Sequence, residues 1–398
     1  MFQKLSNVIR AAPDIQDVCP KANIYFKQNP MELHSKPPLA ASEERLIELI
    51  QKQRGWLSFE HFMAAALYHP DFGYYAARIR DVGRKGDFTT SAQPESILAR
   101  AIARWALHQK PLLRGPHRWH LIELGGGNGT MASEIFRSLG WRGRLGCTYH
   151  LVEISRPLRD LQKRKLHGHR VCWHDSLGAA LDDAKGIALI FSNEVVDAYP
   201  CRRLLQENGF WFELGLTLEN GRIEETTREL TKSECQEMPS SVFAIDPQTK
   251  SQTVEVHSAY RDDLLAAASR LERGSVLTID YGDHFPALYH RQPNGTARGY
   301  FHHIRVEGMD LYTRMGQQDL TADVNFTDLE NWGLEAGWTN ETLIPQRDFI
   351  LRWLGNITPK TTDEARLLDP IGAGLAFKVL QQNCGLTQAM NGSFPALL

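Results

Sequence analysis

The sequence predicts an α/β protein built on a doubly wound, mainly parallel sheet. From about residue 118, short apolar runs alternate with helical segments: "WHLIELG" precedes "GTMASEIFRSLG", and "CTYHLVEIS" precedes "RPLRDLQKRKL". A glycine-rich loop, "GGGNG", joins the first of these strands to its helix. This alternation is typical of βα repeats, which place helices on both faces of one sheet.

Three later segments extend the predicted sheet. "RVCWHDSL" is a short strand, and "GIALIFSNEVVDAYP" is a buried strand that ends in a polar loop. "GSVLTIDYGD" is another strand and follows a helix at about 258–272. The segments at about 201–257 and 281–325 do not follow this alternation, so we expect them to be insertions that form an α+β lobe on the substrate side together with the N-terminal helices.

The remainder of the chain divides by composition. Residues 1–41 are polar and contain several prolines, which predicts a poorly ordered N-terminal arm. Residues 42–116 predict a helical N-terminal lobe: Ser42 can cap a helix whose apolar residues Leu46, Ile47 and Ile50 share one face, and "ESILARAIARWALHQ" is a further helix. Residues 117–398 then form the core with its two insertions.

Composition excludes several classes of protein. A net charge of -2 argues against a general nucleic-acid or membrane-surface binder. No apolar run reaches the roughly 20 residues that span a bilayer, and residues 1–40 lack a secretory signal. Six cysteines without a CxxC pair predict reduced thiols in a cytosol-like compartment. We expect a cytoplasmic location, with the mitochondrial matrix as the alternative because the basic residues near the N-terminus resemble a presequence.

The glycine loop indicates the kind of ligand. It lacks the lysine of a phosphate-binding P-loop, and Thr130 stands where a dinucleotide site has its third glycine. Gly125 and Gly127 allow close backbone approach, and the preceding carboxylate of Glu123 favours a cation. S-adenosylmethionine carries both an ammonium and a sulfonium. A tight strand–helix turn without a ligand is the alternative.

Acidic residues also follow the next two strands. Glu153 ends the second strand, where an acid typically accepts hydrogen bonds from both ribose hydroxyls of a nucleotide-like cofactor. Asp175 follows the third strand and could accept from an adenine amino group. Capping of the next helix by Asp175 or Ser176 is an equally good interpretation.

The loop "FSNEVVDAYP" follows the fourth strand, at the edge where open α/β sheets bind ligands. Asn193, Glu194 and Asp197 should therefore lie over the cofactor. Paired carboxylates suit a guanidinium, which they could orient for methyl transfer. Alternatively, Asp197 caps a helix and only Asn193 or Glu194 touches a ligand.

Several motifs in one order resemble the MidA-like methyltransferases, whose mitochondrial members assist assembly of respiratory complex I. The matching segments run from about residue 42 to 380 and include "SFEHFMAAALYHPDFGYY", "GRKGDFTTSAQPE", "IELGGGNGTMASEI", "SNEVVDAYPCRRL", "LTIDYGD" and "QQDLTADVNFTDL". The resemblance implies a seven-stranded class I methyltransferase core and S-adenosylmethionine as donor. It also implies a protein acceptor, an arginine of a complex I subunit in the mitochondrial members.

The resemblance also assigns roles to residues. It implies that "GDFTT" folds over the cofactor, so that the N-terminal lobe closes on the cofactor. It also implies that Glu194 contacts the acceptor. With the residues argued above, the predicted cofactor set is Gly86, Asp87, Phe88, Thr89, Glu123, Gly125, Gly127, Asn128, Glu153, Ile154, Asp175, Ser176 and Asn193, and the predicted catalytic pair is Glu194 and Asp197. The loop departs from many relatives, which have a proline and an arginine there, and residues 299–303 match loosely.

Other patterns lead to weaker expectations. His284, His290, His302 and His303 lack the spacing of a metal site, so no metal is expected. "DLTADVNF" alternates like a strand with one polar face, which could line an acceptor groove. A non-catalytic assembly chaperone and a nicotinamide-dependent oxidoreductase remain alternatives, although no catalytic set for hydride transfer can be assembled. The sequence does not decide between a monomer and a homodimer.

Overall fold

The computed structural model describes residues 39–78, 95–114, 118–245, 251–290 and 292–386. Within them, the centre of the fold is one mixed sheet with the strand order β15-β16-β10-β5-β2-β3-β4, and a short additional strand, β14, pairs with β10. The strands are β2 (Trp119–Leu124), β3 (Cys147–Val152), β4 (Val171–His174), β5 (Ile187–Asn193), β10 (Arg273–Asp283), β14 (Val324–Asn325), β15 (Thr339–Pro345) and β16 (Phe377–Cys384). The described sheet therefore has eight strands, where seven were expected.

The five strands that the sequence predicts are parallel to one another. β10, β5, β2, β3 and β4 pair in that order, whereas β16 runs antiparallel to both β10 and β15. Every residue of β3 is buried, and so are the central five residues of β5. Strands covered on both faces consist of nearly continuous apolar residues, which is why these segments are recognisable in the sequence.

Helices cover both faces of this sheet. One face packs against α4 (Glu95–Gln109), α5 (Thr130–Arg144) and α11 (Gln346–Leu354). The other packs against α7 (Leu177–Asp183), α9 (Ser258–Ala268) and α10 (Phe326–Glu335). The shorter α12 (Thr362–Leu367) and α13 (Ala373–Ala376) follow α11, and α6 (Arg156–Lys165) joins β3 to β4. The prediction assigned α4 to the N-terminal lobe, but its apolar side chains, including Trp105, are buried with the central sheet.

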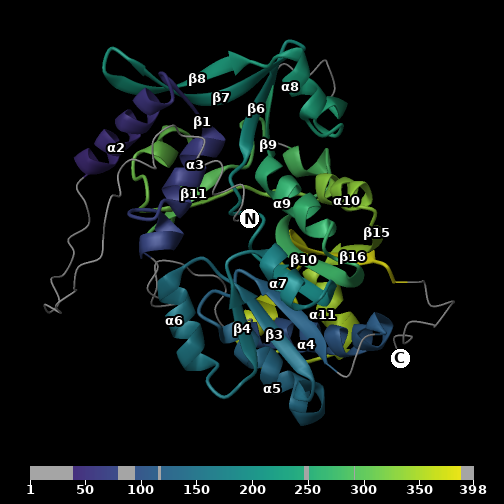
Figure 1. Cartoon of the computed structure of the whole chain (residues 1–398). Coiled ribbons are helices and arrows are strands. Elements are labelled where there is room, and N and C mark those ends of the chain that lie inside the picture. Colours follow the sequence, from purple (N-terminus) through teal and green to yellow (C-terminus); the bar gives the residue numbers. More distant parts are fainter. Residues whose placement is uncertain (1–38, 79–94, 115–117, 246–250, 291, 387–398) are drawn as a thin grey trace, which may run out of the picture.

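A second, antiparallel sheet lies above the first one in Figure 1. Its order is β1-β7-β6-β9, with β8 paired to β7. The strands are β1 (Trp56–Ser58), β6 (Arg202–Glu207), β7 (Phe210–Glu219), β8 (Arg222–Glu229) and β9 (Ser251–Val256), accompanied by α2 (Leu39–Lys52), α3 (Phe59–Tyr68) and α8 (Lys232–Glu237). Because β1 pairs with β7, the N-terminal segment and the insertion at 201–257 form one unit. A three-stranded sheet of β11 (Arg298–Phe301), β12 (Ile304–Val306) and β13 (Asp319–Thr321) completes the second insertion.

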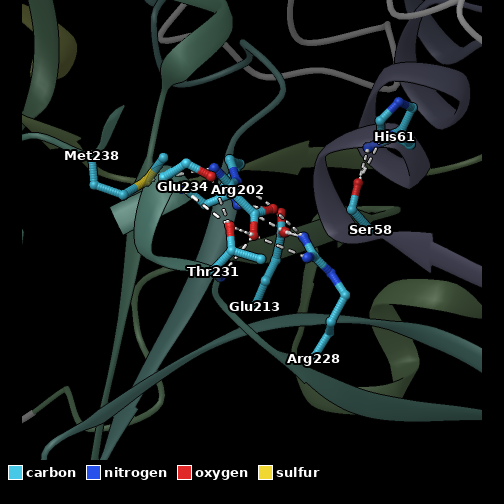
Figure 2. A network of polar contacts seen from close by, with 9 residues as sticks. Ser58, His61, Arg202, Glu213, Arg228, Thr231, Glu234 and Met238 are labelled. Atoms are coloured by element: carbon cyan, nitrogen blue, oxygen red, sulfur yellow. Dashed lines mark hydrogen bonds and ion pairs between the residues drawn. The ribbon is translucent and has the colours of Figure 1, made fainter. Parts of the chain in front are cut away.

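An ion-pair network fixes the second sheet (Figure 2). The buried carboxylate of Glu213 accepts two hydrogen bonds from Arg202 and one from Arg228, each at 2.8 Å. Arg228 also donates to Glu234 at 2.7 Å, and Glu234 closes a capping box with Thr231 at the start of α8. Networks of this kind contribute more than isolated surface pairs because one ordered side chain serves several partners. The network joins β6, β7, β8 and α8.

Candidate functional site

The glycine loop makes the turn between β2 and α5. Gly125 and Gly127 have φ angles of +66° and +50°, which residues other than glycine adopt only at a cost in free energy. The Gly125 N–H donates to the carbonyl of Val152 at 2.9 Å, so the loop is held against the end of β3. A Cβ on Gly125 would lie 2.8 Å from the Val195 side chain, whereas one on Gly127 would meet no described atom within 4 Å. Gly127 therefore leaves open space for a ligand.

This loop borders a pocket at the carboxyl ends of β2, β3 and β5. Six predicted site residues line the pocket: Gly125, Gly127, Glu153, Ile154, Asn193 and Glu194. The pocket continues between α7 and α9, where its walls are apolar and include Leu177, Leu181, Leu264 and Ala267. A polar mouth at the strand ends and an apolar interior are typical of small-molecule sites.

Glu153 is the buried acid of the pocket. Its Oε1 accepts the Ser155 N–H at 2.9 Å, and its Oε2 accepts from Gln162 at 3.2 Å. Burial raises the pKa of this carboxyl to about 7, although the hydrogen bonds from Ser155 and Gln162 oppose the rise. A carboxylate so placed and held can accept hydrogen bonds from a ligand that carries adjacent hydroxyls.

Glu194 follows β5 in an unusual backbone conformation. Its φ is +52°, a left-handed value that costs a residue with a side chain about 1–3 kcal/mol and persists only where the surroundings impose it. Here the Glu194 N–H donates to the carbonyl of Ile279 in β10 at 3.0 Å, and Asn193 donates to the Glu194 carboxylate at 3.2 Å. Both side chains line the pocket. The strain supports the hypothesis that this position is functional.

Asp280 holds the loop that follows Glu194. Its Oδ2 accepts the backbone N–H groups of Val195, Val196 and Asp197 at 3.2, 3.0 and 3.3 Å. Asp280 is completely buried near the carboxyl end of β10. These three hydrogen bonds satisfy backbone N–H groups of the turn after β5, and they keep Glu194 at the edge of the pocket. Asp280 was not predicted as a site residue because its role depends on the pairing of β10 with β5.

Asp197 is placed differently from its prediction. Glu194 and Asp197 were expected to face one pocket together, but the described pocket walls include only Glu194. Asp197 is buried and accepts hydrogen bonds from Tyr281 and Thr321, the second at 2.8 Å. Because the segment turns around Asp280 rather than forming a regular helix, the two carboxylates diverge. Asp197 therefore supports the site from behind.

Four predicted cofactor residues are absent from the described pocket walls, each for a local reason. Glu123 is buried and accepts a hydrogen bond from Tyr149 at 2.7 Å. Asn128 accepts from Thr130 at the start of α5. Asp175 is exposed and pairs with Arg159, and the Ser176 hydroxyl caps α7 by accepting the Ala179 N–H at 3.2 Å. The capping alternative for the third strand end thus matches the structure. Gly86, Asp87, Phe88 and Thr89 lie outside the described residues.

Two tyrosines of the N-terminal segment were not predicted to belong to the site. Tyr68 and Tyr75 line the pocket, with ring centroids 5.6 Å apart. Tyr68 donates to the carbonyl of Ala198 at 2.8 Å, and Tyr75 donates to Asp319 at 2.6 Å. The quoted segment "ALYHPDFGYY" contains both, but periodicity alone assigns them to a helix and a turn.

Carboxylates accumulate behind the pocket. Burial raises the pKa values of Asp280 and Asp319, and the nearby carboxylates of Asp197 and Glu194 raise them further. Arg298 opposes this repulsion at Asp197 and Asp319 and is itself paired with Asp323 at 2.6 Å. In their ionised form these carboxylates would attract a cation that enters beside Glu194.

The fold and the pocket together define a class I methyltransferase. The parallel strands, the antiparallel β16 and the glycine loop at the carboxyl edge fit this class, and the space beside Gly127 with the carboxyl of Glu153 fits S-adenosylmethionine. A family model described as "Putative S-adenosyl-L-methionine-dependent methyltransferase" matches residues 101–344. The chain belongs to this family, so its cofactor is S-adenosylmethionine.

The curated relatives are mitochondrial proteins. The chain is 27% identical over 299 residues to the mitochondrial protein arginine methyltransferase NDUFAF7 homologue of Drosophila melanogaster. The aligned region covers 68% of this chain and 65% of that protein. It is 25% identical over 301 residues to mitochondrial NDUFAF7 of Homo sapiens, covering 69% and 65%. The match therefore spans slightly less than two thirds of either relative. The resemblance to the MidA-like family is confirmed.

Two solved structures share the fold. One is an uncharacterized protein of the COG1565 superfamily from Burkholderia thailandensis, with a TM-score of 0.74, 24% identity, and coverage of 89% of this chain and 94% of that one. The other is a superfamily member from the same organism bound to S-adenosyl-homocysteine, with the same TM-score and identity and coverage of 88% and 93%. These similarities support the methyltransferase fold. No helix among the described residues is long and apolar enough to cross a membrane.

Proposed function

We propose that the protein methylates an arginine of a partner protein, such as a subunit of respiratory complex I. The single observation that carries this proposal is the strained Glu194 at the pocket edge, backed by the buried carboxylates Asp197, Asp280 and Asp319. A guanidinium is always charged and pairs bidentately with a carboxylate, so this arrangement suits it better than a neutral acceptor. The relatives named as protein arginine methyltransferases support the same substrate class.

In this proposal the glycine loop and Glu153 bind the cofactor, while Asn193 positions Glu194. The backbone at Gly125 and Gly127 approaches the amino-acid portion of the cofactor, Glu153 accepts hydrogen bonds from the ribose hydroxyls, and Ile154 covers the sugar. The apolar walls between α7 and α9 receive the adenine ring. Asn193 orients the Glu194 carboxylate through their 3.2 Å hydrogen bond.

Glu194 acts on the acceptor. When bound, S-adenosylmethionine supplies the methyl group. Glu194 holds the guanidinium with one nitrogen facing the donor, and its carboxylate accepts the proton that this nitrogen releases as its new N–C bond forms. Tyr68 and Tyr75 wall the pocket on the side of the N-terminal segment and restrict water. Most of the acceleration comes from positioning, because the reaction is a direct displacement.

The experiment uses purified protein, labelled S-adenosylmethionine and an extract of cells that lack the protein. After hydrolysis of the extract proteins, labelled methylarginine is the expected product, whereas labelled methyllysine or methylhistidine would overturn the arginine assignment. Glu194→Gln should lower kcat about 100-fold or more and leave the dissociation constant of S-adenosylmethionine unchanged. Glu207→Gln, a change on the exposed end of β6, is the matched control and should retain full activity.

The chaperone alternative has its own outcome. If Glu194→Gln restores assembly of the partner complex in those cells as well as the unchanged protein does, methyl transfer is not the function, and the pocket serves stability. Membership of the methyltransferase family argues against the alternative of a nicotinamide-dependent oxidoreductase. We further propose a bacterial cytoplasmic location or the mitochondrial matrix, since the named relatives are mitochondrial. A homodimer stays a prediction, to be tested by the mass of the protein in solution.

A further inference from the structure

Three histidines form a ladder across the neighbouring strands β2, β3 and β4 of the central sheet. His120 lies on β2, His150 on β3 and His174 on β4. His120 Nδ1 is 2.8 Å from His150 Nε2, and His150 Nδ1 is 2.9 Å from His174 Nε2. His150 is completely buried, while His174 is slightly exposed. None of these three histidines is among the residues that line the pocket described above.

Two more potential metal ligands lie at the same place. Cys172 is the neighbour of His150 in the β3–β4 ladder, and Asp183 ends α7. The Cys172 sulfur lies within 4.8 Å of a ring nitrogen of His150 and of a carboxylate oxygen of Asp183. A cysteine, two histidines and an aspartate are ligand types that zinc prefers.

The distances match a tetrahedral face. Asp183 Oδ2 is 3.6 Å from His150 Nδ1 and 3.7 Å from His174 Nε2, and the third edge, between the two nitrogens, is 2.9 Å. Ligands about 2.0–2.1 Å from a tetrahedral zinc ion are separated by about 3.4 Å. The observed edges bracket this value, so a metal ion can replace the hydrogen bond between His150 and His174 with small side-chain movements.

His120 has the position of an outer partner. If His150 binds an ion through Nδ1, its Nε2–H can donate to His120 Nδ1 at the observed 2.8 Å. Metal-bound histidines commonly donate their second N–H to such a partner, which fixes the ring and its tautomer.

We propose that His150, Cys172 and Asp183 bind one divalent transition-metal ion, with Zn²⁺ as the best fit, that His174 turns toward the ion as the fourth ligand, and that His120 orients His150. Binding forms one Zn–S, two Zn–N and one Zn–O bond and releases the thiol proton of Cys172 to solvent. The proton that His150 and His174 share moves to the other nitrogen of the ring that carries it. The half-exposed Asp183 gives the ion a path from solvent. The ion would tie the edge strand β4 to α7, the two elements that flank Asp175 and Ser176.

The test uses the purified full-length protein after removal of metals with a chelator. Titration with Zn²⁺ against a chromophoric chelator should give one site per chain and a higher melting temperature. Titration with Co²⁺ should give visible bands of a tetrahedral site and a near-ultraviolet charge-transfer band from the thiolate. Cys172→Ser should abolish this charge-transfer band, whereas Cys235→Ser, in the distant α8, should retain it.

Asp183→Asn supplies a second variant because its partly exposed side chain is tolerant of change. Loss of this ligand should weaken zinc binding at least about tenfold, since loss of an outer partner alone costs 10–100-fold. Asp182→Asn, an adjacent exposed position that pairs with Arg270, should bind as the unchanged protein does. No zinc binding at micromolar concentration, or binding that neither Cys172→Ser nor Asp183→Asn weakens, would overturn the proposal.

Discussion

The affinity for S-adenosylmethionine should depend on pH through Glu153. Its pKa is raised by burial to about 7, above the usual value of 4.5. The ribose hydroxyls can both donate only to the ionised carboxylate, so binding requires loss of the proton. With a pKa of about 7, roughly 9% of the protein is ionised at pH 6 and roughly 91% at pH 8. The dissociation constant should therefore be about tenfold larger at pH 6 than at pH 8.

Glu153→Gln should remove this dependence. The amide keeps one acceptor, so the variant loses about one charge-assisted hydrogen bond of 1.5–3 kcal/mol, equivalent to roughly 10- to 150-fold weaker binding at pH 8. Its dissociation constant should then be nearly constant from pH 6 to 8. The raised pKa also has a consequence for the fold: between pH 4.5 and about 7 the folded chain holds a proton that the unfolded chain has lost, so this group's contribution to stability decreases as pH rises.

Isothermal calorimetry with S-adenosyl-homocysteine at pH 6, 7 and 8 measures both effects. Thermal unfolding of Glu153→Gln must be checked in parallel, because its amide faces Gln162, which now donates to Glu153 at 3.2 Å. Equal affinity of the unchanged protein at pH 6 and 8 would refute the reasoning. So would a variant that is folded and retains the tenfold dependence, since another group would then be responsible.

Three further predictions follow from the glycine loop, the ion-pair network and the Tyr75 hydroxyl. Gly127→Val and Gly140→Val both place a side chain at positive φ in open space, so both should lower the stability of the fold by a similar amount. Only Gly127→Val should lose cofactor binding in calorimetry. An equal loss of binding in both variants would contradict the proposed site. The pKa of Glu234 is lowered to about 2 by its bond to an arginine, so its contribution to stability is present above pH 4.5 and is lost as pH falls through about 2. Urea unfolding of Glu234→Gln should therefore approach the unchanged protein's stability at low pH, and a constant difference would contradict this. Tyr75→Phe removes the hydroxyl that donates to buried Asp319 at 2.6 Å and should cost about 1–3 kcal/mol in urea unfolding, whereas no loss would mean that Asp319 finds another donor.

The sequence predicted the parts of the fold that local patterns determine. The strands β2, β3, β5 and β10 were identified because largely buried strands consist of apolar runs, whereas the half-buried β4 was identified by its place in the alternation of strands and helices. The insertion at 201–257 was seen only as weak strands. Strand β8 has no buried residue, and the pairing of β7 with β1 joins residues about 160 positions apart in the chain.

The site followed the same division. Gly125, Gly127 and Glu153 were predictable because backbone geometry and strand ends place them at the pocket. Asp197 was assigned to the pocket because a helical turn was assumed, and Asp280, which binds the backbone of this segment, lies 83 residues further along the chain. The histidine ladder depends on the register of β2, β3 and β4, which no local pattern contains.

The most direct test of the central claim, that this pocket holds S-adenosylmethionine, is calorimetric titration of the purified protein. S-adenosylmethionine, S-adenosyl-homocysteine and NAD are titrated in parallel into the unchanged protein, Gly127→Val and Gly140→Val. The account predicts saturable binding of the first two ligands at one site per chain, lost in Gly127→Val and retained in Gly140→Val, and no binding of NAD. Binding of NAD alone, or equal affinity for S-adenosylmethionine in Gly127→Val, would contradict it.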